Sequence, residues 1–440
     1  MKQAVILAGG KGTRLAEHLK GLPKPLVDLA GIPLLERQIR HLAQFGIDDI
    51  VVLVNYAADT IARFFEQRKD LGVHVTLVDD GEPRGTAGAV LACLDRLADR
   101  FLVIYGDTLF NIDVARFVAH HRIAKADATL FLHPNDHPQD SDLVETNDDG
   151  HIVAFHPYPH PSGAYHTNLV NAAFYAMEKG ALLAWSDFRT PSDFVRDLFP
   201  EMIKKNALLN GYRSFEYIKD LGTPARLAKV EQALRSGVLH RASLSVKQKA
   251  VFVDRDGTLN VKRGFIAAPE QLDLIPGVGE AIRKLNQHEF RVAVITNQPV
   301  VARGECTFEQ LRHIHDKLET LLGYEGAFVD GLFLCPHHPD SGFAGEIKAL
   351  KVDCDCRKPK TGLVDKAVEQ LNIDRARSWY VGDTTRDIET AKRSGVGSIL
   401  VRTGEAGRDR KYPAIPDFVR PNLKAAVELI LELDGGTTVV

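Results

Sequence analysis

The sequence of 440 residues has no long apolar run, whereas a membrane-spanning helix needs about 18 consecutive apolar residues. The apolar stretch 4–8 is short and is followed at once by two glycines, which argues against a signal-peptide core. The sequence also has no large excess of charge of one sign, because 55 Lys and Arg residues are balanced by 58 Asp and Glu residues, which gives a net charge of −3. We therefore expect a cytoplasmic protein that binds neither a membrane nor a nucleic acid.

Cysteine is scarce, with five residues in the chain, and an odd number in a cytoplasmic protein argues against a disulfide framework. Hydrophobic residues make up 45% and charged residues 26% of the sequence, which is ordinary for a globular protein. This composition excludes a collagen-like chain and a mostly disordered chain. At roughly 150 residues per domain, the length predicts two or three domains.

Strand-like and helix-like segments alternate in two successive parts of the chain. The expected strands of the first part are 4–8, 50–54, 73–78 and 101–105, and those of the second part are 250–253, 292–295, 331–334, 379–381 and 398–401. Such alternation predicts a mostly parallel sheet covered by helices. We therefore predict an α/β protein with two Rossmann-like domains, at 1–236 and 249–432, with a linker at 237–248 and a tail at 433–440.

Two glycine-rich loops in the first part suit a nucleotide. One directly follows the first expected strand and the other opens an expected helix; their residues are Gly9, Gly10, Gly12 and Thr13, and Gly85, Thr86 and Gly88. Glycines after a strand let the backbone approach a ligand and turn its N–H groups toward phosphate, although a tight turn alone gives the same pattern. Arg14 and Lys24 add positive charge to this part of the chain.

Two aspartates of the first part stand at positions that suit a metal ion. Asp107 follows an expected strand, and Asp220 precedes a turn. Ligands of open α/β sheets bind at the carboxyl ends of the strands, and carboxylates together with substrate phosphates are typical ligands of Mg²⁺. Either aspartate alone is also an ordinary helix N-cap residue. Their occurrence with the two glycine loops favours a nucleotide site that binds Mg²⁺.

These motifs resemble those of the sugar-1-phosphate nucleotidyltransferases, over residues 3–235. The resemblance implies that the first glycine loop and Arg14 hold a nucleoside triphosphate. It also implies that Lys24 stabilises the charge that develops on phosphorus, and that Asp107 and Asp220 hold Mg²⁺. Such a reaction rests mainly on positioning and on charge neutralisation, which agrees with the residue types present.

The same resemblance places Gly88 against the nucleoside and Asn171 near the sugar. The Gly-Thr-Ala-Gly form of the second loop is similar to the guanylyltransferases of mannose 1-phosphate and heptose 1-phosphate, which favours GTP. The sequence departs from the family at the lysine that meets the sugar phosphate, since the comparable stretch 154–161 contains no lysine. His156 or His160 could replace it, and a proline-rich surface loop explains the stretch equally well.

The second part begins with an expected strand that ends in Asp254-Arg-Asp256. Two carboxylates after a buried strand are unfavourable unless they bind a cation or take part in chemistry, although a capping turn is the alternative. One carboxylate can attack phosphorus, and the other can transfer a proton. Thr296, Lys358 and Asp383 follow later in the chain. This set combines a nucleophilic carboxylate, a hydroxyl group, a lysine and a second carboxylate further along the chain. Together these groups predict a phosphate site with one Mg²⁺.

This ordered set resembles the haloacid-dehalogenase superfamily of phosphatases, over residues 249–432. The resemblance implies that Asp254 is the nucleophile and that Asp256 is the general acid and base. Thr296 and Lys358 then bind the transferring phosphoryl group, and Asp254, Asp256 and Asp383 hold Mg²⁺. The intervals between these residues leave little room for a separate cap domain, so we expect a nucleotidyltransferase fold followed by a capless haloacid-dehalogenase fold.

Four potential zinc ligands lie in two pairs: Cys335 and His337, and Cys354 and Cys356. Three thiols and one imidazole suit a closed, tetrahedral structural zinc site, with free buried cysteines as the alternative. The zinc loop would present Arg357 and Lys358 to the phosphate.

This zinc loop is similar to the superfamily branch that contains the heptose bisphosphate phosphatases and the histidinol phosphatases. Its Cys-Pro-His-His-Pro form and the long insert before Cys354 favour the heptose phosphatases. The resemblance implies that Asn297, Gln298, Arg303 and Arg357 contact the substrate. The sequence departs from the family at residues 299–300, where Pro-Val stands in place of Ser-Gly.

Together the two resemblances imply a bifunctional enzyme of nucleotide-heptose synthesis. It would remove the 7-phosphate of D-glycero-D-manno-heptose 1,7-bisphosphate and transfer GMP from GTP to the heptose 1-phosphate, with Mg²⁺ at both sites and a structural Zn²⁺. One alternative is a hexose-1-phosphate nucleotidyltransferase fused to a histidinol-phosphatase-like enzyme. Another is a binding protein with one inactive half. The expected partners are these small molecules, and the sequence leaves a homo-oligomer open.

Overall fold

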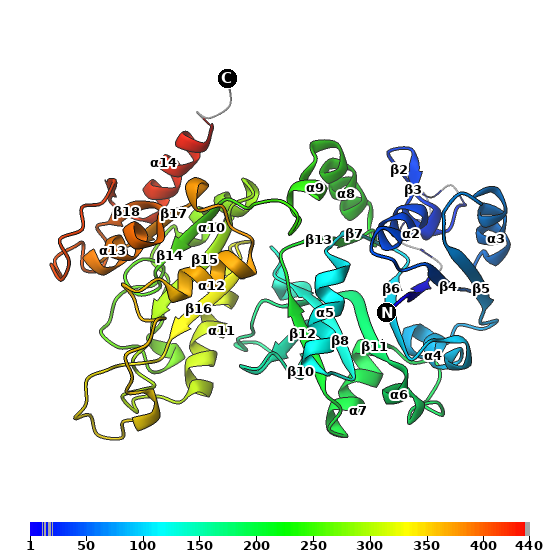
Figure 1. Cartoon of the computed structure of the whole chain (residues 1–440), viewed down its shortest axis with the longest axis horizontal. Coiled ribbons are helices and arrows are strands. Elements are labelled where there is room, and N and C mark those ends of the chain that lie inside the picture. The colour runs from blue at the N-terminus through cyan, green and yellow to red at the C-terminus, as the bar shows by residue number, and fades with distance from the viewer. Residues whose placement is uncertain (11, 13–14, 16–18, 20, 436–440) are drawn as a thin grey trace. The chain divides into compact units, whose positions relative to one another are not determined.

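The structure is a computed structural model that describes residues 1–435 except residues 11, 13–14, 16–18 and 20 (Figure 1). Its contacts divide the chain into two compact units: Met1–His133, Val144–Pro157 and Val170–Ser245 form the first, and Pro134–Leu143, Tyr158–Leu169 and Val246–Val440 form the second. The predicted site residues Thr13 and Arg14, and residues 436–440 of the predicted tail, lie outside the described residues. Among the residues described, no helix has the length and apolar character needed to span a bilayer.

A nine-stranded mixed sheet forms the centre of the first unit. Its strands are β1 (Gln3–Leu7), β4 (Asp49–Val54), β5 (His74–Asp79), β6 (Arg100–Tyr105), β8 (Ala128–His133), β9 (Leu143–Thr146), β10 (Ile152–His156), β11 (Val170–Glu178) and β12 (Leu209–Arg213). Strands β5, β4, β1 and β6 are neighbours in this order and run parallel. Strand β11 runs antiparallel to β6 and β8, so only part of the sheet has the predicted parallel direction.

The helices described in this unit are α2 (Leu34–Gln44), α3 (Ala58–Gln67), α4 (Gly85–Leu91), α5 (Val114–Ala124), α6 (Lys179–Leu183), α7 (Phe199–Lys204), α8 (Pro224–Ser236) and α9 (Val238–Arg241). Ile39 of α2, Ile61 of α3 and Phe117 of α5 share one apolar cluster with Ile50 and Val52 of β4. Alternate side chains of a strand point to one face, which explains why these two strand residues take part. Helix α9 occupies part of the predicted linker 237–248.

The second unit contains a six-stranded sheet in which all neighbouring strands are parallel. In spatial order its strands are β16 (Gly331–Cys335), β15 (Arg291–Asn297), β14 (Ala250–Val253), β17 (Trp379–Gly382), β18 (Gly397–Val401) and β19 (Phe418–Arg420). Because the strands are parallel, the residues after β14, β15 and β17 lie along one edge of the sheet. The predicted α/β class is therefore confirmed for both units.

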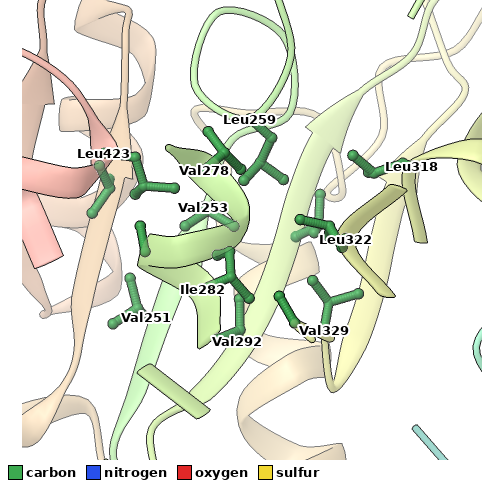
Figure 2. Packing of buried hydrophobic residues seen from close by; sticks show 14 of the residues in the cluster. Val251, Val253, Leu259, Val278, Ile282, Val292, Leu318, Leu322, Val329 and Leu423 are labelled. Carbon is green, nitrogen blue, oxygen red and sulfur yellow. The ribbon is translucent and has the colours of Figure 1, made fainter. Parts of the chain in front are cut away.

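One apolar cluster joins this sheet to helices α10 (Val278–Gln287), α11 (Phe308–Tyr324) and α14 (Leu423–Gly435). Figure 2 shows Val251 and Val253 of β14 among Ile282 of α10, Leu318 of α11 and Leu423 of α14. Burial of each such side chain contributes roughly 1.5–3 kcal/mol. Helix α12 (Gly362–Gln370) contacts β15 and β16, and α13 (Thr385–Ser394) contacts β17 and β18.

The second unit also includes two segments from the first half of the sequence, 134–143 and 158–169. Both pack on helix α11. The backbone N–H of His166 donates to Thr320 Oγ1 at 3.0 Å, and that of Asn168 donates to Glu319 Oε2 at 2.8 Å. Helix α11 therefore binds chain segments that are about 150 positions away in the sequence.

Candidate active sites

A cavity of about 540 Å³ in the first unit brings the two glycine loops together. Of the predicted residues, its lining includes Gly9, Gly10, Lys24, Gly85, Thr86 and Asp107. Gly12, Gly88, Asn171 and Asp220 are not among the lining residues. The loops meet here because they follow β1 and β5, which both run parallel to β4 and end at the same edge of the sheet.

The second glycine loop is tightly packed against another segment of the first unit. Gly85 has a φ of +74°, and a Cβ there would lie 2.3 Å from the carbonyl oxygen of Ser192. The same oxygen accepts hydrogen bonds from the N–H groups of Ala87 and Gly88. Thr86 Oγ1 donates to Asp193 Oδ2 at 2.7 Å. The N–H groups of Ala87 and Gly88 are therefore already engaged within the protein.

Of the two predicted metal-binding aspartates of the first unit, Asp220 ends a strand and Asp107 directly precedes the strand that pairs with it. Asp220 ends β13 (Tyr217–Asp220), which runs antiparallel to β7 (Thr108–Asn111). The N–H of Leu221 donates to the backbone oxygen of Asp107 at 2.8 Å. Each carboxylate contacts a cation: Lys24 Nζ lies 3.2 Å from Asp107 Oδ2, and Arg226 Nη1 lies 2.9 Å from both oxygens of Asp220. Of the two carboxylates only that of Asp107 lines the cavity, and a carboxylate beside substrate phosphates suits Mg²⁺.

The predicted sugar residues lie outside this cavity. Asn171 Nδ2 donates to the hydroxyl of Tyr175 at 2.8 Å, at an irregularity in β11. His156 Nε2 contacts Glu145 Oε2 at 2.9 Å. His160 belongs to the second unit, where its ring centroid lies 5.1 Å from that of His166. Neither of the two proposed replacements for the family lysine lines the nucleotide cavity.

A cavity of about 480 Å³ in the second unit contains most of the predicted phosphatase residues. They are Asp254, Asp256, Thr296, Asn297, Gln298, Arg357, Lys358 and Asp383. Arg303 does not line it; its guanidinium packs between the rings of Phe265 and Phe343, 4.2 Å from each centroid. Asn297 lines the cavity but also holds the backbone of Lys358, accepting from its N–H at 3.0 Å and donating to its oxygen at 3.2 Å.

Sequence reasoning missed several residues of this cavity, among them Lys262, His338, Arg386 and Lys411. Lys262, Arg386 and Lys411 carry the positive charge that suits a phosphorylated ligand, and His338 belongs to the Cys-Pro-His-His-Pro stretch of the zinc loop. Arg386 lies near Arg357 and lowers the pKa of that guanidinium, although burial is the larger cause.

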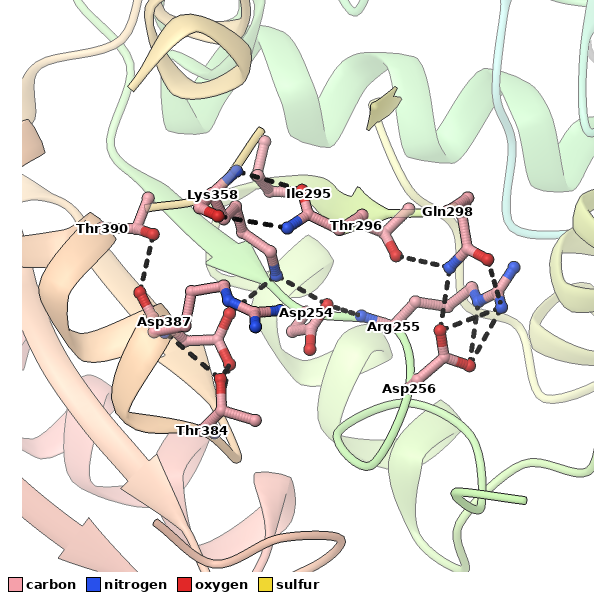
Figure 3. Close-up of polar contacts among 12 residues, drawn as sticks. Asp254, Arg255, Asp256, Ile295, Thr296, Gln298, Lys358, Thr384, Asp387 and Thr390 are labelled. Atoms are coloured by element: carbon pink, nitrogen blue, oxygen red, sulfur yellow. Dashed lines mark hydrogen bonds and ion pairs between the residues drawn. The ribbon is translucent and has the colours of Figure 1, made fainter. Parts of the chain in front are cut away.

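Buried carboxylates surround Lys358 in this cavity (Figure 3). Lys358 Nζ contacts Asp254 Oδ1 at 2.8 Å and Asp387 Oδ1 at 2.7 Å. Oxygens of Asp254, Asp383 and Asp387 lie within 4.8 Å of one another. Burial raises the pKa of Asp254 to about 6 and that of Asp383 to about 8, and Asp383 Oδ1 has no hydrogen-bond partner among the described residues. This excess of buried negative charge fits a divalent cation.

A buried network holds the carboxylate of Asp256 (Figure 3). Arg255 Nη2 lies 2.9 Å from Asp256 Oδ2, and Gln298 Nε2 donates to the same oxygen at 2.8 Å. The side chain of Arg255 is fully buried, and its Nη1 lies 3.0 Å from Nε2 of His315 on α11. Burial opposes ionisation of Asp256, but Arg255 lowers the pKa of this carboxyl below its ordinary range.

We expect the stability of the second unit to fall as the pH falls below 6.5. Burial and the charge of Arg255 lower the pKa of His315 to about 3, whereas an unfolded histidine titrates near 6.5. Between these values the unfolded state binds more protons, so this contribution is present above pH 6.5 and is lost on acidification. Between pH 7 and pH 5 the loss is about 2 kcal/mol.

Urea unfolding of the protein at pH 7 and pH 5 measures this loss. His315→Gln keeps a hydrogen-bond acceptor for Arg255 but cannot take up the proton, so its stability should change less between the two pH values. If the stability of the wild type and of His315→Gln changed equally between the two pH values, His315 would not be the source of the loss.

Two residue pairs form a cluster at the loop that precedes Lys358. The Sγ atom of Cys354 lies 3.5 Å from that of Cys335 and 3.2 Å from that of Cys356. Nδ1 of His337 lies 3.2 Å from Sγ of Cys356 and 3.7 Å from Sγ of Cys335. A zinc tetrahedron with Zn–S bonds of about 2.3 Å has edges of roughly 3.8 Å, so the spacing of these atoms suits zinc.

Each of the two parts of the chain is similar to known proteins. Residues 3–237 match the family described as nucleotidyl transferase, and residues 355–426 match the family described as HAD-hydrolase-like. The D-glycero-beta-D-manno-heptose-1,7-bisphosphate 7-phosphatase of Haemophilus ducreyi is 39% identical over 161 residues, which are 36% of this chain and 86% of that protein. The enzyme of the same name from Escherichia coli is 38% identical over 36% of this chain and 80% of its own length.

Among solved structures, HddC from Yersinia pseudotuberculosis is 26% identical with a TM-score of 0.46, over 53% of this chain and all of HddC; it is also known in complex with GMP-PN. The nucleotidyl transferase match spans more than half of the chain, and the phosphatase relatives are matched over most of their length. This chain is thus a bifunctional enzyme that belongs to the nucleotidyl transferase family through its first part and to the D-glycero-beta-D-manno-heptose-1,7-bisphosphate 7-phosphatase family through its second part.

Proposed function

We propose that the second unit removes the 7-phosphate of D-glycero-D-manno-heptose 1,7-bisphosphate, and that the first unit transfers GMP from GTP to the resulting heptose 1-phosphate. The observation that carries this proposal is the presence of both sites in one chain. A phosphatase that acts at position 7 leaves a sugar 1-phosphate, which is the class of substrate that a sugar nucleotidyltransferase consumes. The two reactions are therefore consecutive, although their units have the opposite order in the sequence.

In the phosphatase site, the Asp254 carboxylate attacks the phosphorus, and the bond from phosphorus to the sugar oxygen breaks. Asp256 transfers a proton to that oxygen and later accepts one from the water that hydrolyses the acyl phosphate. Its contact with Arg255 favours the ionised form of Asp256 that is left after this proton has been given up, which is the form that activates water. Thr296 and Lys358 hold the phosphoryl oxygens, and Lys358 also separates the charges of Asp254 and Asp387.

In the nucleotidyltransferase site, an oxygen of the sugar phosphate attacks the α-phosphorus of GTP, and the bond to the β-phosphate breaks to release pyrophosphate. Lys24 lies at the cavity wall, where its ammonium group can balance the charge that develops on phosphorus. Gly9 and Gly10 let the triphosphate approach the backbone after β1.

Three metal ions fit these residues. Asp107 and Asp220 would hold Mg²⁺ in the first unit, and Asp254, Asp383 and the backbone oxygen of Asp256 would hold Mg²⁺ in the second. Bound Mg²⁺ neutralises phosphate charge in both reactions. The four-residue cluster in the second unit would hold a structural Zn²⁺.

We expect one zinc ion per chain and loss of that ion when Cys354 is replaced with Ser. Arg357 and Lys358 directly follow the cluster, so loss of the metal should displace both side chains and lower phosphatase activity by about tenfold or more. Metal analysis and phosphate release measure the two effects. Cys93→Ala removes a buried thiol of the first unit and should keep the zinc. A wild-type protein without zinc, whose cluster thiols titrate freely, would contradict the site.

Incubation with heptose 1,7-bisphosphate, Mg²⁺ and one nucleoside triphosphate at a time tests the proposed function, with products identified by mass spectrometry. We expect GDP-heptose with GTP. Release of heptose 1-phosphate without any nucleotide sugar would overturn the assignment of the first unit. Activity on mannose 1-phosphate but not on heptose 1-phosphate would make mannose 1-phosphate, rather than heptose 1-phosphate, the substrate of the first unit.

A further inference from the structure

Arg303 lies beside the phosphatase cavity but behind its wall. Its guanidinium lies 4.2 Å from the ring centroid of Phe265 and 4.2 Å from that of Phe343. Phe265 lines the cavity, whereas Arg303 and Phe343 do not. Only 19% of the Arg303 side chain is exposed, and its Nη2 lies 2.7 Å from Glu305 Oε1. The guanidinium therefore supports a wall residue of the cavity from the outer side.

The backbone on both sides of Arg303 is fastened to the long stretch 338–353, which separates the two pairs of zinc-site residues and is here called the insert. The N–H of Ile347 donates to the oxygen of Ala302 at 3.0 Å. Gly304 has a φ of +71°, and a Cβ there would lie 2.0 Å from the carbonyl oxygen of Gly345. Glycine alone fits this close approach, so the insert packs directly on the turn that carries Arg303.

The insert also connects Arg303 with a second wall residue. The ring of Phe343 meets that of His338 edge to face, with 5.6 Å between the centroids. His338 lines the cavity, as Phe265 does. Arg303 therefore contacts one wall residue directly and reaches the other through Phe343. These two wall residues come from loops far apart in the sequence, and Arg303 lies between them.

A guanidinium between two aromatic rings restrains both of them. The face of each ring carries negative charge density that attracts the cation. Phe265 is 47% exposed, so its ring has few other contacts that could fix its rotamer. Without the cation, the ring and the insert would have to be ordered when the substrate binds, and that ordering lowers affinity.

We propose that Arg303 is a positioning residue of the phosphatase site, which holds Phe265 and the insert in the arrangement that accepts the sugar part of the substrate. The proposal rests on the proposed removal of the 7-phosphate. The motif residues of the cavity account for the reacting phosphoryl group, which leaves the wall at Phe265 and His338 for the rest of the substrate. This role differs from the direct substrate contact that the sequence resemblance implies for Arg303.

Phosphate release by full-length Arg303→Met tests the proposal, because methionine keeps an unbranched side chain but has no charge. Heptose 1,7-bisphosphate, heptose 7-phosphate and acetyl phosphate, which has no sugar, are compared. We expect kcat/KM to fall about 10- to 100-fold for both heptose phosphates, mainly through a higher KM, and to stay within about twofold for acetyl phosphate. Arg303→Lys keeps a cation at the rings and should recover most of the loss.

Two results would overturn the proposal. A loss confined to heptose 1,7-bisphosphate would mean that Arg303 binds the 1-phosphate directly. An equal loss with acetyl phosphate would mean that Arg303 only supports the fold of the second unit. Arg393→Met is the matched control, because it removes the same charge from an exposed side chain that contacts Glu389 at 2.7 Å. It should keep activity on all three substrates.

A double variant examines whether Arg303 acts through the ring of Phe265. Phe265→Leu combined with Arg303→Met should lose no more activity on heptose 1,7-bisphosphate than Arg303→Met alone, because the cation then has no ring to hold. Losses that multiply would contradict the proposal. Wild-type protein that hydrolyses histidinol phosphate but not heptose 1,7-bisphosphate would refute only the proposed sugar substrate. The same ratios of variant to wild type, measured with histidinol phosphate and acetyl phosphate, would then decide the role of Arg303.

Discussion

Replacing Asp254 with Asn is expected to abolish phosphate release from heptose 1,7-bisphosphate, by at least about a thousandfold, and to leave nucleotidyl transfer unchanged. The amide is nearly isosteric but is not a nucleophile toward phosphorus. The fold should survive, because Lys358 keeps its contact with Asp387 at 2.7 Å and one of three crowded carboxylates loses its charge.

Phosphate release and pyrophosphate release from the same preparation measure the two activities of Asp254→Asn, the second with heptose 1-phosphate supplied directly. Asp273→Asn, an exposed carboxylate of the second unit that pairs with Arg263, is the control and should keep both activities. Residual phosphatase activity near the wild-type level would remove Asp254 from the role of nucleophile.

Replacing Lys24 with Ala is expected to have the opposite effect, lowering nucleotidyl transfer by about 100- to 1,000-fold and leaving phosphate release intact. The side chain of Lys24 is only 14% exposed, and its ammonium group lies beside Asp107 in the cavity. Its removal takes away a fixed positive charge near the reacting phosphates and leaves Asp107 without its cationic partner. Asp107→Ala should lower the same activity, since it removes a proposed Mg²⁺ ligand.

Lys204→Ala, an exposed lysine of the first unit that contacts Glu201, is the control for Lys24→Ala. Initial rates at saturating heptose 1-phosphate and GTP separate an effect on the chemical step from an effect on binding. The two cavities are lined by different units, so each change should affect one activity only. A folded variant in which either change silenced both reactions would refute the model of two separate sites.

Local pattern accounts for the parts of the fold that the sequence predicts well. The segment 250–253 is a strand with the predicted bounds, and 101–105 and 398–401 are strands to within a residue at each end. Alternation of apolar residues and the punctuation by glycine are short-range signals, and they act on the unfolded chain as on the folded one. The motif residues after β14, β15 and β17 share one cavity for the same reason, because a parallel sheet brings its strand ends to one edge.

Contacts between residues that are far apart in the sequence became known only from the tertiary structure. Nothing local indicates that Arg255 meets His315, that Asn297 holds the backbone of Lys358, or that the segment 158–169 packs on α11. Such contacts depend on strand order and on which side chains become buried together.

The sequence by itself therefore determined the α/β class, the two families of motifs and the residues that carry the proposed chemistry. Only the tertiary structure paired β4 with β5 and brought Arg255 within hydrogen-bond distance of His315. The physical reason is that the register between β4 and β5 is a long-range property, and hydrogen-bond satisfaction exists only once the chain is packed.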